Sequence, residues 1–321
     1  MKAIQLTEVG GPEVLKLVDI PEPEPGPDQA IVELSAAGVN YMDVQARIGA
    51  NNPTLPLIPG GEGSGIVVKI GKSVTEVSIG DRVAYTGAGM SYAEKVCVPS
   101  WRLVRVPEGM DIEVGAAAML QGMTAHYLAH ATYPLKVGDT ALVHSGAGGV
   151  GLLLIQMAKM AGALVITTVS TKEKSVIAQD AGADHTILNS EQNVADEVMK
   201  ITNNQGVQVV YDAVGKDTFE GSVASLAPRG YLVSYGAASG PVPPVALSVL
   251  NPKSLFLTRP TLVSYTATRA ELEQRSGDVL GWVKSGKLHV KIHGRYPLKD
   301  AAEAHRDLQG RFTSGKLLLI P

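Results

Sequence analysis

The chain of 321 residues contains a single cysteine, Cys97. A lone thiol cannot form an internal disulfide, and it cannot supply the several cysteine ligands of a structural zinc site. The sequence also lacks a long run of basic residues, and its formal net charge is −3. Because proteins that bind nucleic acids usually carry a basic patch, we expect no nucleic-acid partner.

Long uninterrupted apolar runs are absent as well. The N-terminus mixes charged and apolar residues and lacks the apolar core of a signal peptide. The most apolar stretch, GLLLIQMAKMAGALVITTV, is interrupted by Lys159 and Gly162, which favours a helix followed by a strand over a membrane span. With 45% hydrophobic residues the composition suits a soluble globular protein of about two domains. We therefore expect a cytosolic protein with no membrane partner.

Residues 1–120 have the pattern of a β-rich domain. Short apolar runs such as AIVELSAAGV, GIVVKIG and DRVAYTG are separated by Gly, Pro and Asp. The segment PEPEPGP at residues 21–27 predicts a stiff connector, because successive prolines cannot donate the hydrogen bonds of a sheet.

Residues 121–256 have a different pattern, in which strands alternate with helices. ALVHSG, ALVITTVS, HTIL, QVVYDAVG and GYLVSYG predict strands, and helical segments separate them. This alternation predicts a parallel doubly wound sheet. Residues 257–321 return to mixed content, with a helix predicted for YPLKDAAEAHRDLQGR and a strand for KLLLIP. We therefore expect an α/β domain inserted in a β-rich domain, which the C-terminal part rejoins.

The strongest motif is ALVHSGAGGVG, in which Gly146, Gly148 and Gly151 have the spacing GxGxxG. The spacing alone arises often by chance, but here it follows a predicted strand and opens a predicted helix. The first glycine permits a tight turn, the second allows a pyrophosphate to approach the backbone, and the third lets the helix pack on the strand. The motif predicts a dinucleotide-binding site at the start of this helix.

The residues after the second strand indicate which dinucleotide is bound. An NAD site usually has an acidic residue about 20 residues past the glycines, on the ribose 2′-hydroxyl. Here that strand ends at Ser170 and Thr171, and Glu173 follows only inside the helix, between Lys172 and Lys174. Hydroxyls and a lysine would bind a 2′-phosphate, which a carboxylate would repel. The sequence favours NADPH.

The stretch PGGEGSGIVVKIGKSVTEVSIGDRVAY at residues 59–85 resembles the signature of the medium-chain dehydrogenase/reductase superfamily. Zinc-binding members carry a histidine ligand where this chain has Gly61. The resemblance extends over the whole chain and points to the zinc-free quinone oxidoreductase branch, which includes bacterial NADPH:quinone reductases and lens ζ-crystallins. Further matching stretches are AAGVNYMDVQARIG, VVYDAVGKDTFEGS, LTRPTL and the C-terminal YPLKDAAEAHRDLQGRFTSGKLLLIP.

The resemblance implies a Rossmann domain, residues 121–256, inserted in a GroES-like β-rich catalytic domain formed by residues 1–120 and 257–321. It also implies a homodimer, for which the edge segment SLFLTRPTLV is a candidate. Glu62, in the motif, is expected to anchor its loop by hydrogen bonds rather than to perform chemistry.

The resemblance also implies site residues. Asn40 faces the nicotinamide end and lines the substrate pocket, together with Gln45, which stands where many members have a tyrosine. Asn189 stands where a tyrosine or histidine often completes the pocket for the adenosine phosphate. The cofactor-binding residues implied are Asn40, Thr124, Tyr127, Gly146, Ala147, Gly148, Gly149, Val150, Ser170, Lys174, Asn189, Tyr235, Gly236, Ala237, Arg259, Thr261 and Arg311.

No metal is expected, because a quinone is already electron-poor and needs less help than a ketone in accepting hydride. No residue stands out as a general acid; Tyr127 and water are both candidates. The His126/His130 pair fits packed or surface histidines better than metal ligands. His144 either orients the glycine loop or is simply packed, and Asp212 fits both a loop-capping role and a pocket role.

The function expected is hydride transfer from NADPH to quinones. Reduction of α,β-unsaturated ketones or aldehydes is the alternative within enzymes. A cofactor-binding protein with a structural, crystallin-like role is the alternative from another class.

Overall fold

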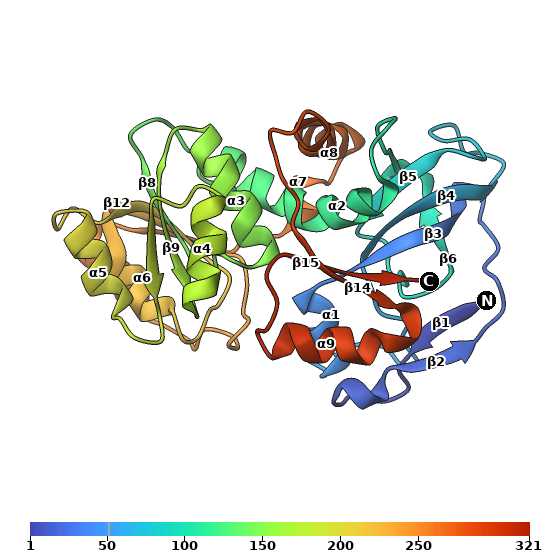
Figure 1. The fold of residues 1–321 in the computed structure, drawn as a ribbon, viewed down its shortest axis with the longest axis horizontal. Coiled ribbons are helices and arrows are strands. Elements are labelled where there is room, and N and C mark those ends of the chain that lie inside the picture. Colours follow the sequence, from blue (N-terminus) through green and yellow to red (C-terminus); the bar gives the residue numbers. More distant parts are fainter. Residues whose placement is uncertain (51) are drawn as a thin grey trace. The chain divides into compact units, whose positions relative to one another are not determined.

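The computed structural model describes residues 1–50 and 52–321, which form two compact units (Figure 1). The first unit comprises residues 1–123 and 266–321, and the second comprises residues 124–265. No helix in these described residues is long and apolar enough to cross a membrane.

The first unit contains the β-rich part of the chain. The strands of its main sheet are β3 (Gln29–Val39), β4 (Glu62–Ile70), β5 (Arg82–Thr86), β6 (Lys95–Pro99), β7 (Val104–Arg105), β14 (Ile292–Pro297) and β15 (Lys316–Ile320). Their order is β14-β15-β3-β4-β5-β7, and β6 pairs with β3. A separate antiparallel pair joins β1 (Lys2–Gln5) to β2 (Lys16–Asp19). The predicted connector at residues 21–27 contains no strand.

Strand β15 joins the end of the chain to its beginning. It pairs antiparallel with β3, with Leu317 opposite Val39. Lys316 precedes Leu317 and Asn40 follows Val39, so this register brings the two polar residues to the same end of the strand pair. The apolar residues of both strands are buried in the core, with Leu317, Leu318 and Leu319 at most 1% exposed.

The first unit also contains helices. They are η1 (Pro12–Val14), α1 (Tyr41–Arg47), η2 (Ser100–Arg102), α8 (Arg269–Lys284), η5 (Leu298–Asp300), α9 (Ala301–Gln309) and most of α2 (Ile112–Tyr127). The helix predicted for YPLKDAAEAHRDLQGR is shorter than expected, because Tyr296 and Pro297 end β14. Pro297 lacks an amide hydrogen and has extended backbone angles, and α9 begins only at Ala301.

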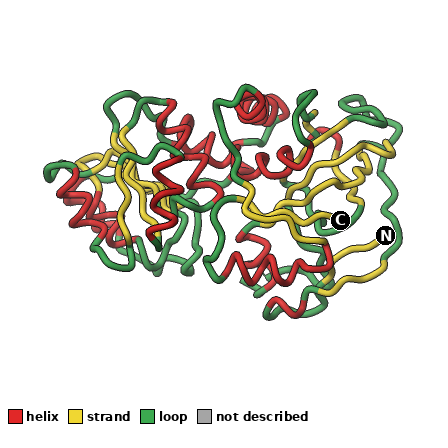
Figure 2. Tube along the Cα trace, viewed as in Figure 1, coloured by secondary structure: helices red, strands yellow, loops and turns green. Residues whose placement is uncertain are grey.

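The second unit is a doubly wound α/β structure (Figure 2). Its strands are β8 (Thr140–Val143), β9 (Leu164–Val169), β10 (His185–Leu188), β11 (Val207–Asp212), β12 (Leu226–Ser234) and β13 (Phe256–Thr258). The pairs are all parallel, and the order is β10-β9-β8-β11-β12-β13. The helices are α3 (Gly149–Met160), α4 (Lys172–Asp180), α5 (Val194–Ile201), α6 (Phe219–Ser225) and α7 (Leu262–Tyr265), with short helices η3 (Leu128–Thr132) and η4 (Leu247–Lys253).

The strand order defines where a ligand would bind. From β8 the chain proceeds through β9 to β10 on one side, and it resumes at β11 on the other side of β8. The winding direction therefore reverses between β8 and β11. In open α/β sheets ligands bind at the carboxyl ends of the strands at such a switch point.

The unit boundaries lie later than the expected ones at residues 120/121 and 256/257. Strand β13 pairs with β12, with Leu257 opposite Leu232, so the chain stays in the parallel sheet beyond residue 256. At the other boundary α2 continues without a break from the first unit into the second, and no change of pattern marks the division.

Candidate active site

The glycine loop joins β8 to α3 as the motif predicts. A Cβ atom on Gly146 would lie 1.9 Å from Oγ1 of Thr167, and one on Gly151 would lie 2.4 Å from the Ser145 carbonyl oxygen. The nearest atom to a Cβ on Gly148 is the same carbonyl oxygen, at 3.1 Å. Packing thus requires the first and third glycines, whereas the second keeps the backbone accessible at the start of α3. The first amides of this helix have no partner within it and suit an anion.

The other predicted residues of the glycine loop lie between Gly146 and α3 or in the first turn of α3. Ala147 is buried, and Gly148 is the N-cap residue of α3, in which Gly149 and Val150 form the first turn. These residues therefore present backbone groups, not charged side chains, at the carboxyl end of β8.

Ser170 and Asn189, which are predicted for the adenosine phosphate, directly follow β9 and β10. The backbone amide of Asn189 donates to the carbonyl oxygen of Val169 at 3.1 Å, which brings Asn189 next to Ser170. Oγ1 of Thr171 caps α4 by accepting the Lys174 amide at 3.3 Å. The pKa of Glu173 is lowered by its own backbone amide and then by the Thr171 hydroxyl, so this carboxylate is engaged in the helix cap.

Tyr235, Gly236 and Ala237, which by the family resemblance belong to the segment that passes the nicotinamide ribose, directly follow β12. Tyr235 and Gly236 donate their amides to the Asp212 carbonyl at 2.9 and 3.2 Å, and Ala237 follows. Arg259 donates from Nη1 to the carbonyl oxygens of Ser234 and Gly236, at 3.4 and 3.3 Å. Four of the predicted residues thus lie together at the carboxyl edge of the sheet.

Three other predicted residues have different surroundings. Thr124 and Tyr127 are buried in α2, and the Tyr127 ring stacks on Tyr265 with centroids 4.3 Å apart. Burial raises the pKa of the Tyr127 hydroxyl. Thr261 is exposed, and its hydroxyl lies 3.2 Å from that of Ser264.

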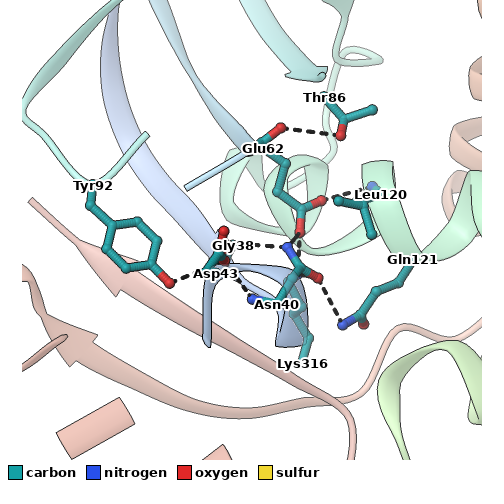
Figure 3. Close-up of polar contacts among 10 residues, drawn as sticks. Gly38, Asn40, Asp43, Glu62, Thr86, Tyr92, Leu120, Gln121 and Lys316 are labelled. Carbon is teal, nitrogen blue, oxygen red and sulfur yellow. Dashed lines mark hydrogen bonds and ion pairs between the residues drawn. The ribbon is translucent and has the colours of Figure 1, made fainter. Parts of the chain in front are cut away.

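In the first unit, Asn40 lies at the centre of a buried polar cluster with Glu62 and Lys316 (Figure 3). Asn40 donates from Nδ2 to Oε1 of Glu62 at 2.6 Å, and its Oδ1 accepts from Nζ of Lys316 at 2.8 Å. Lys316 also forms an ion pair with Glu62, and these two side chains are 1% and 0% exposed. Oε2 of Glu62 accepts the Leu120 amide of α2 at 2.7 Å. These bonds confirm that Glu62 anchors its loop.

The absence of a side chain at Gly38 makes room for the same cluster. A Cβ atom at this position would lie 2.3 Å from Oε1 of Glu62, so the glycine makes room for the carboxylate. Gln121 completes the surroundings by donating from Nε2 to Oδ1 of Asn40 at 3.3 Å. The orientation of the Asn40 amide is therefore fixed by partners on both its nitrogen and its oxygen.

A second buried chain starts from Asn40. Its backbone amide donates to Oδ2 of Asp43 at 2.8 Å, which also accepts from the Tyr92 hydroxyl at 3.2 Å. That hydroxyl lies 3.0 Å from Nε2 of His305. Burial raises the pKa of Asp43 to about 7. Burial, and then the charge of Arg47, lower the pKa of His305 to about 3.

Gln45 and Arg311 lie outside these hydrogen-bonded chains. Gln45 is half-buried in α1, and its carbonyl accepts the amide of Ala50. Arg311 is exposed in the turn after α9, with φ of 58°.

The sequence pattern did not indicate Lys316, Asp43, Tyr92 or His305. In KLLLIP the lysine looks like the polar end of a strand, and only the pairing of β15 with β3 shows that it is buried. Asp43 lies three residues after Asn40, which is the spacing of a capping box and was the one available signal. Among residues 1–50 and 52–321, no group of three or more His, Cys, Asp or Glu side chains is placed to hold a metal ion.

Two family models match the chain. The model described as Alcohol dehydrogenase GroES-like domain matches residues 26–108, and the one described as Zinc-binding dehydrogenase matches residues 149–282. Together with the two units, they define the class: a dehydrogenase that combines a GroES-like domain with a nucleotide-binding α/β domain.

Individual relatives indicate to which branch of this class the protein belongs. The chain is 45% identical to a quinone oxidoreductase of Pseudomonas aeruginosa, over 100% of this chain and 99% of that protein. It is 38% identical to a 2-haloacrylate reductase of a Burkholderia species, over 97% and 96%. The structure of Escherichia coli quinone oxidoreductase complexed with NADPH superposes with a TM-score of 0.98 at 39% identity, and each chain is covered completely. The chain belongs to the quinone oxidoreductase branch of the medium-chain dehydrogenase/reductase superfamily.

Proposed function

We propose that this protein transfers hydride from NADPH to quinones. The observation that carries the proposal is the carboxyl edge of the second unit, where a glycine loop lies beside a strand end without a free acidic residue. The backbone amide of Asn189 donates to the Val169 carbonyl beside Ser170, that of Lys174 donates to Thr171, and Glu173 is engaged in its own helix cap. The relatives named quinone oxidoreductase, one of them complexed with NADPH, support the proposal.

The residues present fit this coenzyme. In the proposal, the first turn of α3 binds the pyrophosphate through its amides, and Ser170, Lys174 and Asn189 bind the 2′-phosphate. Tyr235 to Ala237, Arg259, Thr261, Thr124 and Tyr127 contribute to the rest of the site in the second unit. Asn40 and Arg311 of the first unit remain predicted coenzyme-binding residues. When bound, NADPH supplies the hydride.

Within the first unit, the surroundings of Asn40 are rigid. Glu62, Lys316 and Gln121 hold the Asn40 amide in one orientation, and the ion pair leaves the cluster without net charge. A neutral, fixed surface suits a flat quinone, whose reduction depends mainly on positioning. Gln45 lines the substrate pocket in the same proposal.

Steady-state kinetics test the proposal. NADPH oxidation should be rapid with 1,4-benzoquinone and slow when NADH replaces NADPH. Tight NADPH binding with no turnover on any acceptor would instead favour a structural, crystallin-like role.

A second activity, reduction of electron-poor alkenes, has one observation in its favour. The Burkholderia relative, at 38% identity over nearly the whole chain, is named 2-haloacrylate reductase. A conjugated alkene shares the electrophilic character of a quinone. Faster turnover with 2-chloroacrylate or an enone than with benzoquinone would assign this activity in place of the first.

We propose that the reaction needs no metal. The matched coenzyme-domain region, residues 149–282, contains no cysteine, and Gly61 occupies the position of a histidine ligand. The thiol of Cys97 lies 3.2 Å from Oε1 of Gln29, and Glu62 is paired with Lys316. We also propose a cytoplasmic location, which cell fractionation can test.

We propose a homodimer formed through β13. This strand lies at the end of the sheet order, and its residues Phe256 and Leu257 are exposed by 49% and 41%. Exposed apolar residues on an open strand edge favour pairing with another strand. Pairing with the same strand of a second copy would bury both edges.

A further inference from the structure

A chain of buried polar side chains crosses the carboxyl edge of the second unit. His144 follows β8, Thr168 lies in β9, Asp212 ends β11 and Ser222 lies in α6. All four are at most 2% exposed. Nδ1 of His144 lies 3.1 Å from Oγ1 of Thr168, and its Nε2 lies 3.0 Å from Oγ of Ser222. Ser222 in turn donates to Oδ2 of Asp212 at 3.0 Å.

The donors and acceptors fix where each proton lies. Because Ser222 gives its proton to the Asp212 carboxylate, its oxygen must accept from His144, which requires a hydrogen on Nε2. A neutral imidazole has one N–H, so Nδ1 accepts from the Thr168 hydroxyl. The oxygen of Thr168 accepts the Ser145 amide at 3.2 Å. Every member of the chain is thereby satisfied, and burial lowers the pKa of His144, which agrees with a neutral ring.

One end of the chain holds the glycine loop. Ser145, whose amide is bound by Thr168, has φ of 58°, a conformation that costs energy for a residue other than glycine. The next amide, of Gly146, donates to the Thr168 carbonyl at 3.0 Å. The two hydrogen bonds that Thr168 accepts keep this strained turn in place.

The other end holds the loops after β11 and β12. Oδ1 of Asp212 accepts the amides of Val214 and Gly215 at 2.8 and 3.0 Å. Its backbone carbonyl accepts the amides of Tyr235 and Gly236. Asp212 therefore fixes two loops, one with its side chain and one with its backbone.

We infer that His144, Ser222 and Asp212 are positioning residues for the coenzyme, because they tie the pyrophosphate loop to the loop that holds the nicotinamide ribose. This inference rests on the proposed function and adds residues that do not themselves touch the coenzyme. The Ser–His–Asp combination is not a nucleophilic triad, since the Ser222 hydroxyl is fully buried and directs its proton to Asp212.

Ser222→Ala tests the link, with Ser225→Ala as the matched control. Ser225 is also fully buried in α6, but its hydroxyl donates to the Gly221 carbonyl and not to the chain. The dissociation constant of NADPH, measured by fluorescence titration, should rise about tenfold in Ser222→Ala, as expected for one buried hydrogen bond, and remain near the wild-type value in Ser225→Ala.

The weakening should be equal for NADPH and NADH, because the chain reaches the pyrophosphate and ribose loops and not the 2′-phosphate pocket. Equal dissociation constants in the two serine variants would overturn the inference. Failure of the wild type to bind either coenzyme would instead refute the proposed function.

Histidine ¹⁵N NMR of the wild-type protein provides a readout that does not depend on how the variants fold. The ring of His144 should carry its hydrogen on Nε2 and have a pKa below its ordinary 6.5. In Ser222→Ala this tautomer should lose its preference, while Ser225→Ala should retain it. A hydrogen on Nδ1, or protonation near pH 6.5, would contradict the hydrogen-bond directions inferred for His144, Thr168 and Ser222.

Discussion

At the scale of single residues, the buried Glu62–Lys316 pair shows how a charged motif residue can be structural. Each charge loses its hydration on burial, and the pair offsets that cost only with further hydrogen bonds, here to Asn40 and to Leu120. The predicted anchoring by Glu62 is therefore seen in these contacts, and its partner Lys316 is the residue that the sequence did not reveal.

Removing that partner should be costly. Lys316→Met leaves the Glu62 carboxylate buried without its cation, and we expect the free energy of unfolding to fall by about 3–5 kcal/mol. The double variant Glu62→Gln/Lys316→Met should recover most of this loss. Urea denaturation measures both. A loss in the double variant as large as in the single one would show that the ion pair is not the cause.

Lys174 decides the choice of coenzyme in our proposal. Lys174→Ala should raise the dissociation constant of NADPH by roughly tenfold or more, because a charged hydrogen bond to phosphate is lost, and leave that of NADH almost unchanged. The exposed Lys200→Ala on α5 serves as the control. Similar losses for both coenzymes would remove Lys174 from the 2′-phosphate pocket.

Asp43 and His305 should contribute to stability with opposite pH dependence. The folded pKa of Asp43, about 7, lies above its ordinary 3.8, so its contribution is lost as pH rises from about 4 to 7. The folded pKa of His305, about 3, lies below its ordinary 6.5, so its contribution is gained as pH rises from about 3 to 6.5. The two contributions change the unfolding free energy with pH in opposite directions, so they cancel between about pH 4 and 6.5.

Asp43→Asn should reveal the pH dependence of the unfolding free energy that His305 causes. Relative to the wild type, its unfolding free energy should increase by about 1.4 kcal/mol per pH unit between pH 4.5 and 6. Chemical denaturation at several pH values measures this difference. Parallel stability curves for the two proteins would mean that Asp43 does not hold its proton in the folded state.

At the scale of elements, the glycine loop and the strands behave as their patterns predict. α3 begins at Gly149, within the glycine motif that predicts the start of a helix. The departures have local causes. Pro297 delays the last helix, and β13 keeps residues 256–258 in the parallel sheet because its pairing with β12 outweighs the loss of the alternating pattern.

The edge strand β13 is the element on which the proposed dimer depends. Leu257→Lys places a charge on this edge and should convert a dimer to a monomer in sedimentation velocity, because edge charges oppose strand pairing. Val137→Lys, at an 82% exposed apolar site elsewhere in the second unit, should leave the dimer intact. Identical sedimentation of both variants and the wild type would refute pairing through β13.

At the scale of the whole molecule, the proposal requires activity without a metal. Dialysis against EDTA should leave kcat for benzoquinone unchanged, and elemental analysis should find less than about 0.1 zinc per chain. A zinc-dependent alcohol dehydrogenase treated in the same way should lose its activity. Loss of quinone reduction after chelation, with recovery on adding zinc, would overturn this part of the proposal.

The sequence by itself determined the α/β insertion, the glycine loop and the strand end without an acidic residue, because these depend on periodicity and on residues close together in the chain. Only the tertiary structure decided the roles of Lys316, His305 and Ser222, whose partners lie 254, 213 and 78 residues away. Strand register and helix packing bring such residues together, and neither is encoded in a local pattern. The sequence left alternatives for His144 and Asp212. The partners of the His144 ring, Thr168 and Ser222, come from β9 and α6, and the Asp212 side chain caps the loop of Val214 and Gly215.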